Sequence, residues 1–187
     1  AMGEMLAAFK RAEPRATIEI FDGTEQELSN RLDDRSLDYA LSIHRGQGAE
    51  AALPLYEEGY SFILAPDHAL SGRTRVTAAD LGEEYMIVRS RCEVLSETSR
   101  YFTDQNIRPR LVYRTPNDSR AIAMVAAGLG GTVVPTSLVD DRVAAVQLQG
   151  FDYRRKIALF RPGYQLPAGV AEVGERFEVH VQDYLQA

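Results

Sequence analysis

The chain holds one thiol, and its setting is that of a nucleophile. Cys92 follows a predicted strand, residues 85–89, and stands where a predicted helix, residues 93–105, begins. Partial positive charge at the amino end of a helix lowers the pKa of a thiol and so raises its thiolate population. An imidazole is a suitable base for such a thiol, and His44, at the end of another predicted strand, is the candidate. One open interpretation is therefore a cysteine-dependent enzyme.

Metal and cofactor chemistry lack their usual motifs in this sequence. The histidines, His44, His68 and His180, stand far apart, and neither a His-Glu-x-x-His helix nor paired cysteines at zinc-ligand spacing occur. A Gly-x-Ser-x-Gly elbow and a phosphate-binding loop are also missing, and the glycines of residues 128–131 lack the spacing of a dinucleotide fingerprint. We therefore expect neither a metal nor a cofactor.

Three predicted helix starts carry residues suited to holding a small molecule. Thr24 and Asn117 each precede a helix as a capping residue, and Ser90, Cys92 and Glu93 stand at a third helix start. The amino ends of helices offer unpaired N–H groups and partial positive charge, which bind carboxylates. We predict that the three starts converge on one ligand, preferably an anion. A Glu93 carboxylate turned toward that ligand would instead select a neutral or cationic one.

The predicted effector-binding set extends to the strands beside these helices. Ser42 and His44 end a predicted strand at the opening of the same predicted ligand site. Gly130 allows the backbone to approach a neighbouring segment closely before Thr132 begins another strand. A helix cap, strand packing and a surface position remain open as structural roles for individual members. The complete set is Thr24, Ser42, His44, Ser90, Cys92, Glu93, Asn117, Gly130 and Thr132.

Arginines near the predicted site also favour an anionic ligand. Arg45, Arg89, Arg91 and Arg120 stand close to the predicted cleft mouths. Chance placement is the alternative, because the chain has 21 lysine and arginine residues in total.

Hydrophobic periodicity predicts alternating helices and strands in both halves of the chain. The first half is expected to contain a helix at 2–9, a strand at 16–21, a helix from residue 24 and strands at 37–43, 53–56 and 60–65. The second half is expected to contain a helical turn at 76–81, strands at 85–89, 110–114, 132–134, 144–148 and 154–160, and helices at 93–105, from 117 and at 168–185. This order predicts an α/β fold.

The same pattern predicts two lobes, each with a mostly parallel sheet flanked by helices. Residues 1–65 and 162–187 are assigned to lobe I and residues 66–161 to lobe II, with two crossings between the lobes. Open α/β sheets bind ligands at the ends of their strands, so we expect the ligand in the cleft between the lobes.

Composition limits the partners. The 187 residues include 27 Asp and Glu against 21 Lys and Arg, a formal net charge of −6, and such a surface repels a nucleic-acid duplex. The sequence lacks an apolar run long enough to cross a membrane and a secretory signal, and one cysteine fits a reducing compartment. We expect a cytoplasmic protein with no membrane contact.

Four segments, in this order, resemble one protein family. They are Asp-Tyr-Ala-Leu at 38–41, Pro-Asp-His-Ala-Leu at 66–70, Val-Thr-Ala-Ala-Asp-Leu at 76–81 and Val-Ala-Ala-Gly-Leu-Gly-Gly at 125–131 before Pro135. Together they are similar to the LysR-type transcriptional regulators over nearly the whole chain. The resemblance implies an effector-binding domain with a two-lobed fold like that of periplasmic solute-binding proteins. It also implies a small-molecule effector and no enzymatic activity.

The resemblance carries expectations about assembly. Family domains pair head to tail, so we expect a homodimer or higher oligomer in which residues 2–11 and 16–21 meet residues 93–105 and 110–114 of a second copy. The family contacts DNA through a winged helix-turn-helix that this sequence does not contain, so DNA binding is expected only through such a domain. A solute-binding protein of a transporter remains an alternative with the same fold.

One departure from the family is expected to affect lobe I. Family domains begin with a strand and a Ser or Thr at the mouth of the first helix, and the sequence has neither before residue 2. We expect the neighbours of that strand to lack a pairing partner unless another segment replaces it.

Overall fold

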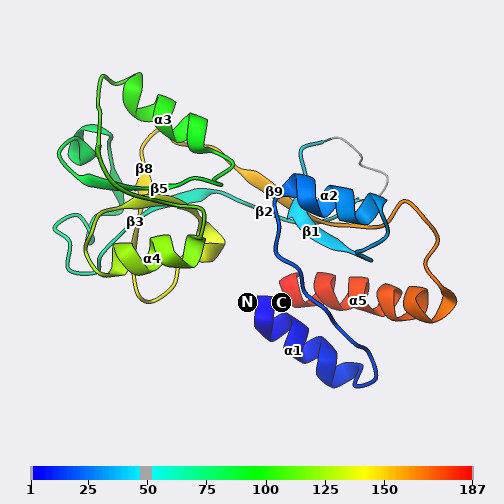
Figure 1. Cartoon of the computed structure of the whole chain (residues 1–187). Coiled ribbons are helices and arrows are strands. Elements are labelled where there is room, and N and C mark those ends of the chain that lie inside the picture. Colours follow the sequence, from blue (N-terminus) through cyan, green and yellow to red (C-terminus); the bar gives the residue numbers. More distant parts are fainter. Residues whose placement is uncertain (1, 47–51, 187) are drawn as a thin grey trace. The chain divides into compact units, whose positions relative to one another are not determined.

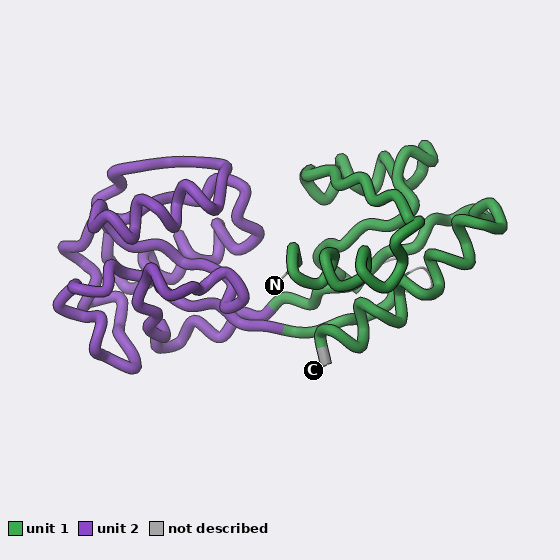
Figure 2. Tube along the Cα trace, turned by 90° about the horizontal axis from the view of Figure 1, so that it is seen from below, with its two compact units in different colours: residues 1–57, 155–187 green, residues 58–154 purple. Residues whose placement is uncertain are grey.

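The computed structural model describes residues 2–46 and 52–186. The chain divides into two compact units, which Figure 2 draws in different colours. Unit 1 combines Ala1–Glu57 with Arg155–Ala187, and unit 2 is Glu58–Arg154. The chain therefore passes between the units twice, and both crossings come several residues earlier than predicted. The strand at residues 60–64 pairs within unit 2, and the strand at residues 155–160 pairs within unit 1.

Unit 1 is built on a small sheet with helices beside it (Figure 1). Its strands are β1 (Ala40–Ile43), β2 (Ala52–Glu58) and β9 (Arg155–Phe160), in the order β1-β9-β2, and β1 runs antiparallel to β9. Its helices are α1 (Met2–Ala12), α2 (Glu25–Asp33) and α5 (Ala168–Gln186). Four of these elements come from the first third of the chain and two from its last fifth.

Helices α1 and α5 pack against each other inside unit 1. The rings of Phe9 and Phe177 meet edge to face at 5.1 Å, and Nε2 of His180 lies 2.9 Å from the Met5 carbonyl oxygen. Phe177 also contacts the ring of Tyr39, whose pKa is raised to about 12 by burial and by the nearby Glu178 carboxylate. The prediction that the last helix covers the first lobe is consistent with this packing.

The predicted strand at residues 16–21 is wrong. This segment lies outside every helix and strand of the structure, and Ile20 is 64% exposed and Phe21 39% exposed. A strand exists only through a ladder with a neighbour, and within the described residues no strand pairs with this segment. The guanidinium of Arg31 instead stacks 3.7 Å from the centre of the Phe21 ring.

Unit 2 contains β3 (Tyr60–Leu64), β4 (Arg75–Val76), β5 (Tyr85–Arg89), β6 (Arg110–Thr115), β7 (Thr132–Pro135) and β8 (Ala144–Leu148). It also contains α3 (Leu95–Thr103), α4 (Asp118–Ala126) and the short 3₁₀ turns Ala79–Leu81 and Thr136–Leu138. Strands β4-β8-β3-β7 form one sheet and β5-β6 another. Figure 1 shows α3 and α4 on opposite sides of these strands.

The prediction of mostly parallel sheets is wrong. Strands β5 and β6 are parallel, as are β4 and β8, but β3 runs antiparallel to both β7 and β8 and β1 runs antiparallel to β9. A largely apolar strand such as β3, all of it buried, has the same sequence pattern in a parallel and in an antiparallel sheet. Composition therefore could not decide the direction of its neighbours.

Two glycines bring β7 against β5. Gly131 donates its N–H to the Tyr85 carbonyl oxygen at 2.8 Å and accepts from Ile87 N–H at 2.8 Å. A Cβ on Gly130, whose φ is +155°, would lie 2.5 Å from the Tyr85 carbonyl oxygen, and a Cβ on Gly131 would clash with the buried Phe62 ring. The predicted close backbone approach at these glycines is confirmed.

None of the helices in the described residues is both long and apolar enough to cross a bilayer.

Candidate functional site

The candidate site in unit 2 is organised around Arg89, the last residue of β5. Its side chain is 4% exposed and forms a two-fold ion pair with Asp118, Nε to Oδ1 and Nη2 to Oδ2, each at 2.8 Å. Its Nη1 donates to the Val133 carbonyl oxygen at 3.0 Å. Burial lowers the pKa of Arg89, but the hydrogen bonds to Asp118 and the negative charges of Cys92, Asp118 and Glu93 together outweigh burial, so the pKa lies above its ordinary value. This guanidinium therefore ties β5 to α4 and β7.

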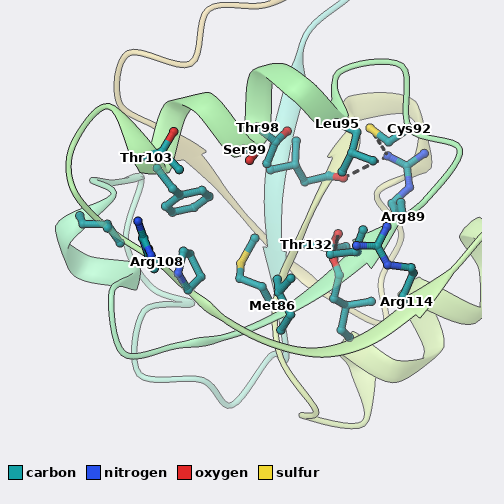
Figure 3. Close-up of a pocket in the computed structure, with 17 residues that line it drawn as sticks. Met86, Arg89, Cys92, Leu95, Thr98, Ser99, Thr103, Arg108, Arg114 and Thr132 are labelled. Atoms are coloured by element: carbon teal, nitrogen blue, oxygen red, sulfur yellow. Dashed lines mark hydrogen bonds between the residues drawn. The ribbon is translucent and has the colours of Figure 1, made fainter.

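Cys92 lies beside this guanidinium. Its Sγ is 3.5 Å from Nη1 of Arg89, which donates to it, and Figure 3 shows the two side chains side by side. Burial raises the pKa of the thiol, while the charge of Arg89 and the N–H of Val94 oppose that rise without cancelling it. Helix α3 begins only at Leu95, with no side-chain cap, so Cys92 and Glu93 precede the helix instead of opening it as predicted.

A raised thiol pKa predicts slow alkylation of Cys92. Because the thiolate is the nucleophile, the native protein should react with iodoacetamide more slowly at pH 8 than free cysteine does, and the rate should keep rising above the pH at which free cysteine levels off. The rate is measured by mass spectrometry across a pH series. The denatured chain is the matched control, and a native rate equal to the denatured rate would contradict the assignment.

Two more predicted residues meet at the ends of β5 and β6. Ser90 N–H donates to the Thr115 carbonyl oxygen at 2.9 Å, and Asn117 N–H donates to Thr115 Oγ1 at 3.1 Å. The Asn117 side chain caps α4 by accepting from Arg120 N–H at 2.9 Å. Within unit 2, the turn at residues 90–93 and the start of α4 are therefore linked through Thr115.

The remaining unit 2 residues of the predicted set are engaged within the protein. Glu93 accepts a hydrogen bond from Tyr60 Oη at 2.9 Å. Thr132, 2% exposed, donates from Oγ1 to the Ile87 carbonyl oxygen at 2.7 Å. Gly130 lies against the backbone of Tyr85.

A cavity of about 320 Å³ lies between α3 and the strands beneath it. Figure 3 shows Leu95, Thr98, Ser99 and Thr103 of α3 along one side, with Met86 and Thr132 on the other. Cys92 and Arg89 lie at one end and Arg108 at the other. The wall is largely carbon, from Met86, Ile87, Leu95, Phe102, Ile107, Pro109, Leu111 and Val133. Of the predicted set, Cys92 and Thr132 line this cavity.

The predicted site residues that lie in unit 1 are Thr24, Ser42 and His44. Thr24 caps α2 in a capping box, accepting from Glu27 N–H at 3.3 Å and donating to the Glu27 carboxylate at 2.8 Å. Ser42 lies in β1 opposite Ala158, and His44 follows that strand, with its backbone N–H donating to the Lys156 carbonyl oxygen. Nε2 of His44 is buried without a hydrogen-bond partner in the described part of the chain. An unpartnered ring nitrogen is the one feature of this group that points to a ligand.

Two of the four arginines that suggested an anionic ligand are already neutralised. Arg45 forms a two-fold ion pair with Glu25, at 2.7 and 2.8 Å, and Arg89 is paired with Asp118. Both pairs join residues far apart in the sequence, so no local pattern could have shown them. The arginines therefore give less support to an anionic ligand than the sequence indicated.

Among residues 2–46 and 52–186, no three His, Cys, Asp or Glu side chains lie close enough together to bind a metal ion.

Comparison with known proteins assigns nearly the whole chain to one family. Residues 1–177 match the family described as LysR substrate binding domain. A "Hydrogen peroxide-inducible genes activator" of Pectobacterium carotovorum subsp. carotovorum is 25% identical over 191 residues, covering 98% of this chain and 63% of that protein. The chain thus spans less than two thirds of the length of this curated relative.

Solved structures share the fold. A putative LysR family transcriptional regulator from Pseudomonas aeruginosa superposes with a TM-score of 0.79 at 21% identity, over 99% of this chain and 67% of that one. The effector binding domain of QuiR, in complex with shikimate, superposes with a TM-score of 0.71 at 16% identity, over 100% of this chain and 90% of that one.

Proposed function

The chain belongs to the LysR substrate-binding domain family, and from this premise we propose that it senses a small molecule for a longer transcriptional regulator in the cytoplasm. The observation that carries the proposal is the match to the family over residues 1–177, joined to a cavity that two predicted site residues line. Binding would shift the balance between two arrangements of the regulator, by no more than the ligand's preference for one of them.

Membership of this family decides between the alternatives left open by the sequence. Its members are non-enzymatic regulators, which confirms the prediction that the chain is not an enzyme and makes the interpretation of Cys92 and His44 as a catalytic pair wrong. It also favours a regulator over the solute-binding protein of a transporter.

A thermal-shift screen of metabolites tests the proposed function. A ligand that binds only the native state raises the melting temperature by mass action, by an amount set by its concentration relative to Kd. Shikimate is one member of the screen, because the related QuiR domain is in complex with it. If no compound in a broad metabolite panel changes the melting temperature, the proposal fails.

The sharing of one ligand by Thr24, the turn at residues 90–93 and Asn117 stays a prediction. Replacing Thr24 and Cys92 with bulky side chains should abolish effector binding while the ligand-free melting temperature changes little. Because Thr24 caps α2, serine at this position is the control that keeps the cap. Normal binding by the bulky variants would remove Thr24 and Cys92 from the site.

We propose a homodimer that uses exposed apolar strand residues. Leu111 and Val112 of β6 are 64% and 45% exposed, and Ile20 and Phe21 are exposed on the segment that was expected to meet them in a second copy. Exposed apolar side chains gathered on one element mark an interaction surface.

A charge on β6 should weaken this dimer. Val112→Glu is expected to raise the dissociation constant at least about tenfold, because the carboxylate would lose its water in the interface. Val179→Glu on α5, where Val179 is 57% exposed and outside the proposed interface, is the control. Sedimentation velocity measures both variants, and a wild-type chain that stays monomeric at high concentration contradicts the proposal.

Peroxide sensing at Cys92 is a second candidate function. It is favoured by the contact between Sγ and Arg89 and by the 25% identical relative that is named as an activator of hydrogen peroxide-inducible genes. The thiolate would attack one peroxide oxygen, the O–O bond would break, and the products would be a sulfenic acid and, after proton transfer, water. The raised pKa of the thiol works against this reaction. Dimedone trapping after peroxide treatment, with Cys92→Ser as control, decides it, since no trapped adduct at Cys92 excludes the candidate.

A further inference from the structure

We propose that the cavity under α3 binds a dianion, a molecule with a compact apolar body and an acidic group at each end. This inference rests on the proposed function, because it names the class of small molecule that the domain takes. It is carried by the charges at the two ends of the cavity and by the carbon wall between them, all within unit 2.

Every charged side chain that lines the cavity is an arginine. The three are Arg89, Arg108 and Arg114, and none of the described lining residues is Asp or Glu. The chain as a whole has 27 acidic residues against 21 Lys and Arg, so its average composition does not account for this lining. Asp118 balances the charge of Arg89, whereas in the described part of the chain neither Arg108 nor Arg114 has an acidic partner. The lining therefore carries an excess of two positive charges.

The two unpaired arginines lie at opposite ends of the cavity (Figure 3). Tyr113 of β6 packs against the hydrophobic cluster to which α4 contributes, so the alternation of a strand turns Arg114 toward the α3 side. Arg108 follows Ile107, whose N–H donates to the Phe102 carbonyl oxygen at 2.9 Å and so holds this segment against the end of α3. Two acidic groups on one ligand can therefore each meet a guanidinium.

The wall between the two ends suits an apolar body. It is carbon from Met86, Leu95, Phe102 and Val133. An apolar cavity of about 150 Å³ holds one benzene molecule, so 320 Å³ has room for roughly two fused rings. The cavity follows α3 from Leu95 to Thr103, a rise of about 12 Å at about 1.5 Å per residue. This rise is of the order of the length of two fused rings with a carboxylate at each end.

The Ser99 hydroxyl adds a neutral donor to the cavity. The Thr98 hydroxyl donates to the Val94 carbonyl oxygen at 2.8 Å, whereas the Ser99 hydroxyl has no acceptor among the described residues. A carboxylate only accepts hydrogen bonds, so both the guanidinium groups and this hydroxyl can donate to it. The two unpaired arginines are exposed, so water screens their charge and each contact with a ligand gives a moderate gain in affinity.

Three probes built on the same two fused rings test the proposal by isothermal titration. At neutral pH, 2,6-naphthalenedicarboxylate has an ionised group at each end, 2-naphthoate has one, and 2-naphthol has none. We expect the dianion to bind at least about fivefold more tightly than 2-naphthoate, and 2-naphthoate at least about fivefold more tightly than 2-naphthol. Added salt should weaken binding of the dianion most, because screening acts on each of its charges.

Arginine variants locate the two charges. Arg108→Gln and Arg114→Gln should each lower affinity for the dianion at least about fivefold and leave 2-naphthoate within about twofold, because the other arginine still meets one carboxylate. Arg100→Gln is the matched control, since Arg100 is an exposed arginine of α3 outside the cavity lining. It removes the same charge and should leave all three probes within about twofold. The order of the probes on the wild-type chain, and its salt dependence, test the proposal even if a variant unfolds.

The inference is supported if the dianion binds most tightly and only Arg108→Gln and Arg114→Gln remove its advantage. It is overturned if 2-naphthoate or 2-naphthol binds as tightly as the dianion, if both of these variants leave the dianion unaffected, or if Arg100→Gln weakens it as much as they do. If no probe binds but a metabolite in the thermal-shift screen does, the inference fails and the proposed function stands. A failure of all three probes and of the screen overturns both.

Discussion

Replacing Asp118 with alanine is expected to lower the free energy of unfolding by about 2–4 kcal/mol. The substitution leaves the guanidinium of Arg89 buried, 4% exposed, with its carboxylate partner gone. A charge in such a place costs far more unpaired than paired, because water cannot replace the lost oxygens. The Asp118 side chain is itself 41% exposed, which keeps the expected loss below that of a fully buried pair.

Chemical denaturation followed by circular dichroism measures this loss. Asp140→Ala is the matched control, because Asp140 forms an ion pair with Arg142 at the surface, at 2.6 Å, and such pairs contribute about 0–1 kcal/mol. Asp118→Asn, which keeps two polar atoms but not the charge, should fall between the two. If Asp118→Ala lowers the free energy of unfolding no more than Asp140→Ala does, the buried ion pair contributes no more to stability than a surface pair.

Gly130→Ala is expected to cost about 3 kcal/mol. The added Cβ would lie 2.5 Å from the Tyr85 carbonyl oxygen and 2.9 Å from the Tyr85 carbonyl carbon, which are backbone atoms that cannot swing away. Overpacking of this kind costs about 1–3 kcal/mol, and the φ of +155° adds strain for any residue with a Cβ.

Gly72→Ala is the control for this substitution. A Cβ on Gly72 in the same unit meets nothing within 4 Å, so the expected change is within about 0.5 kcal/mol. Differential scanning calorimetry of both variants gives the comparison. Since Gly130 was predicted as an effector contact, a stable Gly130→Ala variant with impaired ligand binding would restore that role and contradict the packing role.

Local signals in the sequence predicted most of the helices and strands. Thr24 with Glu27 marked the start of α2, and Asn117 with Gly128 marked both ends of α4, because capping and left-handed glycine are set by neighbouring residues. Strand β5 was predicted with its observed bounds from a segment that contains the strand-forming residues Tyr85, Ile87 and Val88. The segment at 16–21 was predicted with the same logic and is not a strand, because pairing depends on a neighbour that local composition does not reveal.

The candidate site was predictable only in part, because some of its contacts join segments that are far apart in the sequence. Cys92 and Thr132 were named from their places at a strand end and a strand start, and both line the cavity. The ion pair between Arg89 and Asp118 joins residues 29 apart in the sequence, and the wall of the cavity comes from α3, β5, β6 and β7. Residue type indicated neither feature, since both depend on how distant segments pack.

The hydrogen bonds of Arg89 and Thr132 have a consequence for dynamics. They fasten β5 to β7 and α4, so the strand side of the cavity is rigid before any ligand arrives and loses little entropy on binding. Helix α3, which begins without a side-chain cap, is the side able to adjust. Ligand binding should therefore slow amide hydrogen exchange mainly along α3 and leave β5 almost unchanged. The domain would then signal occupancy through the ordering of one helix against a fixed wall.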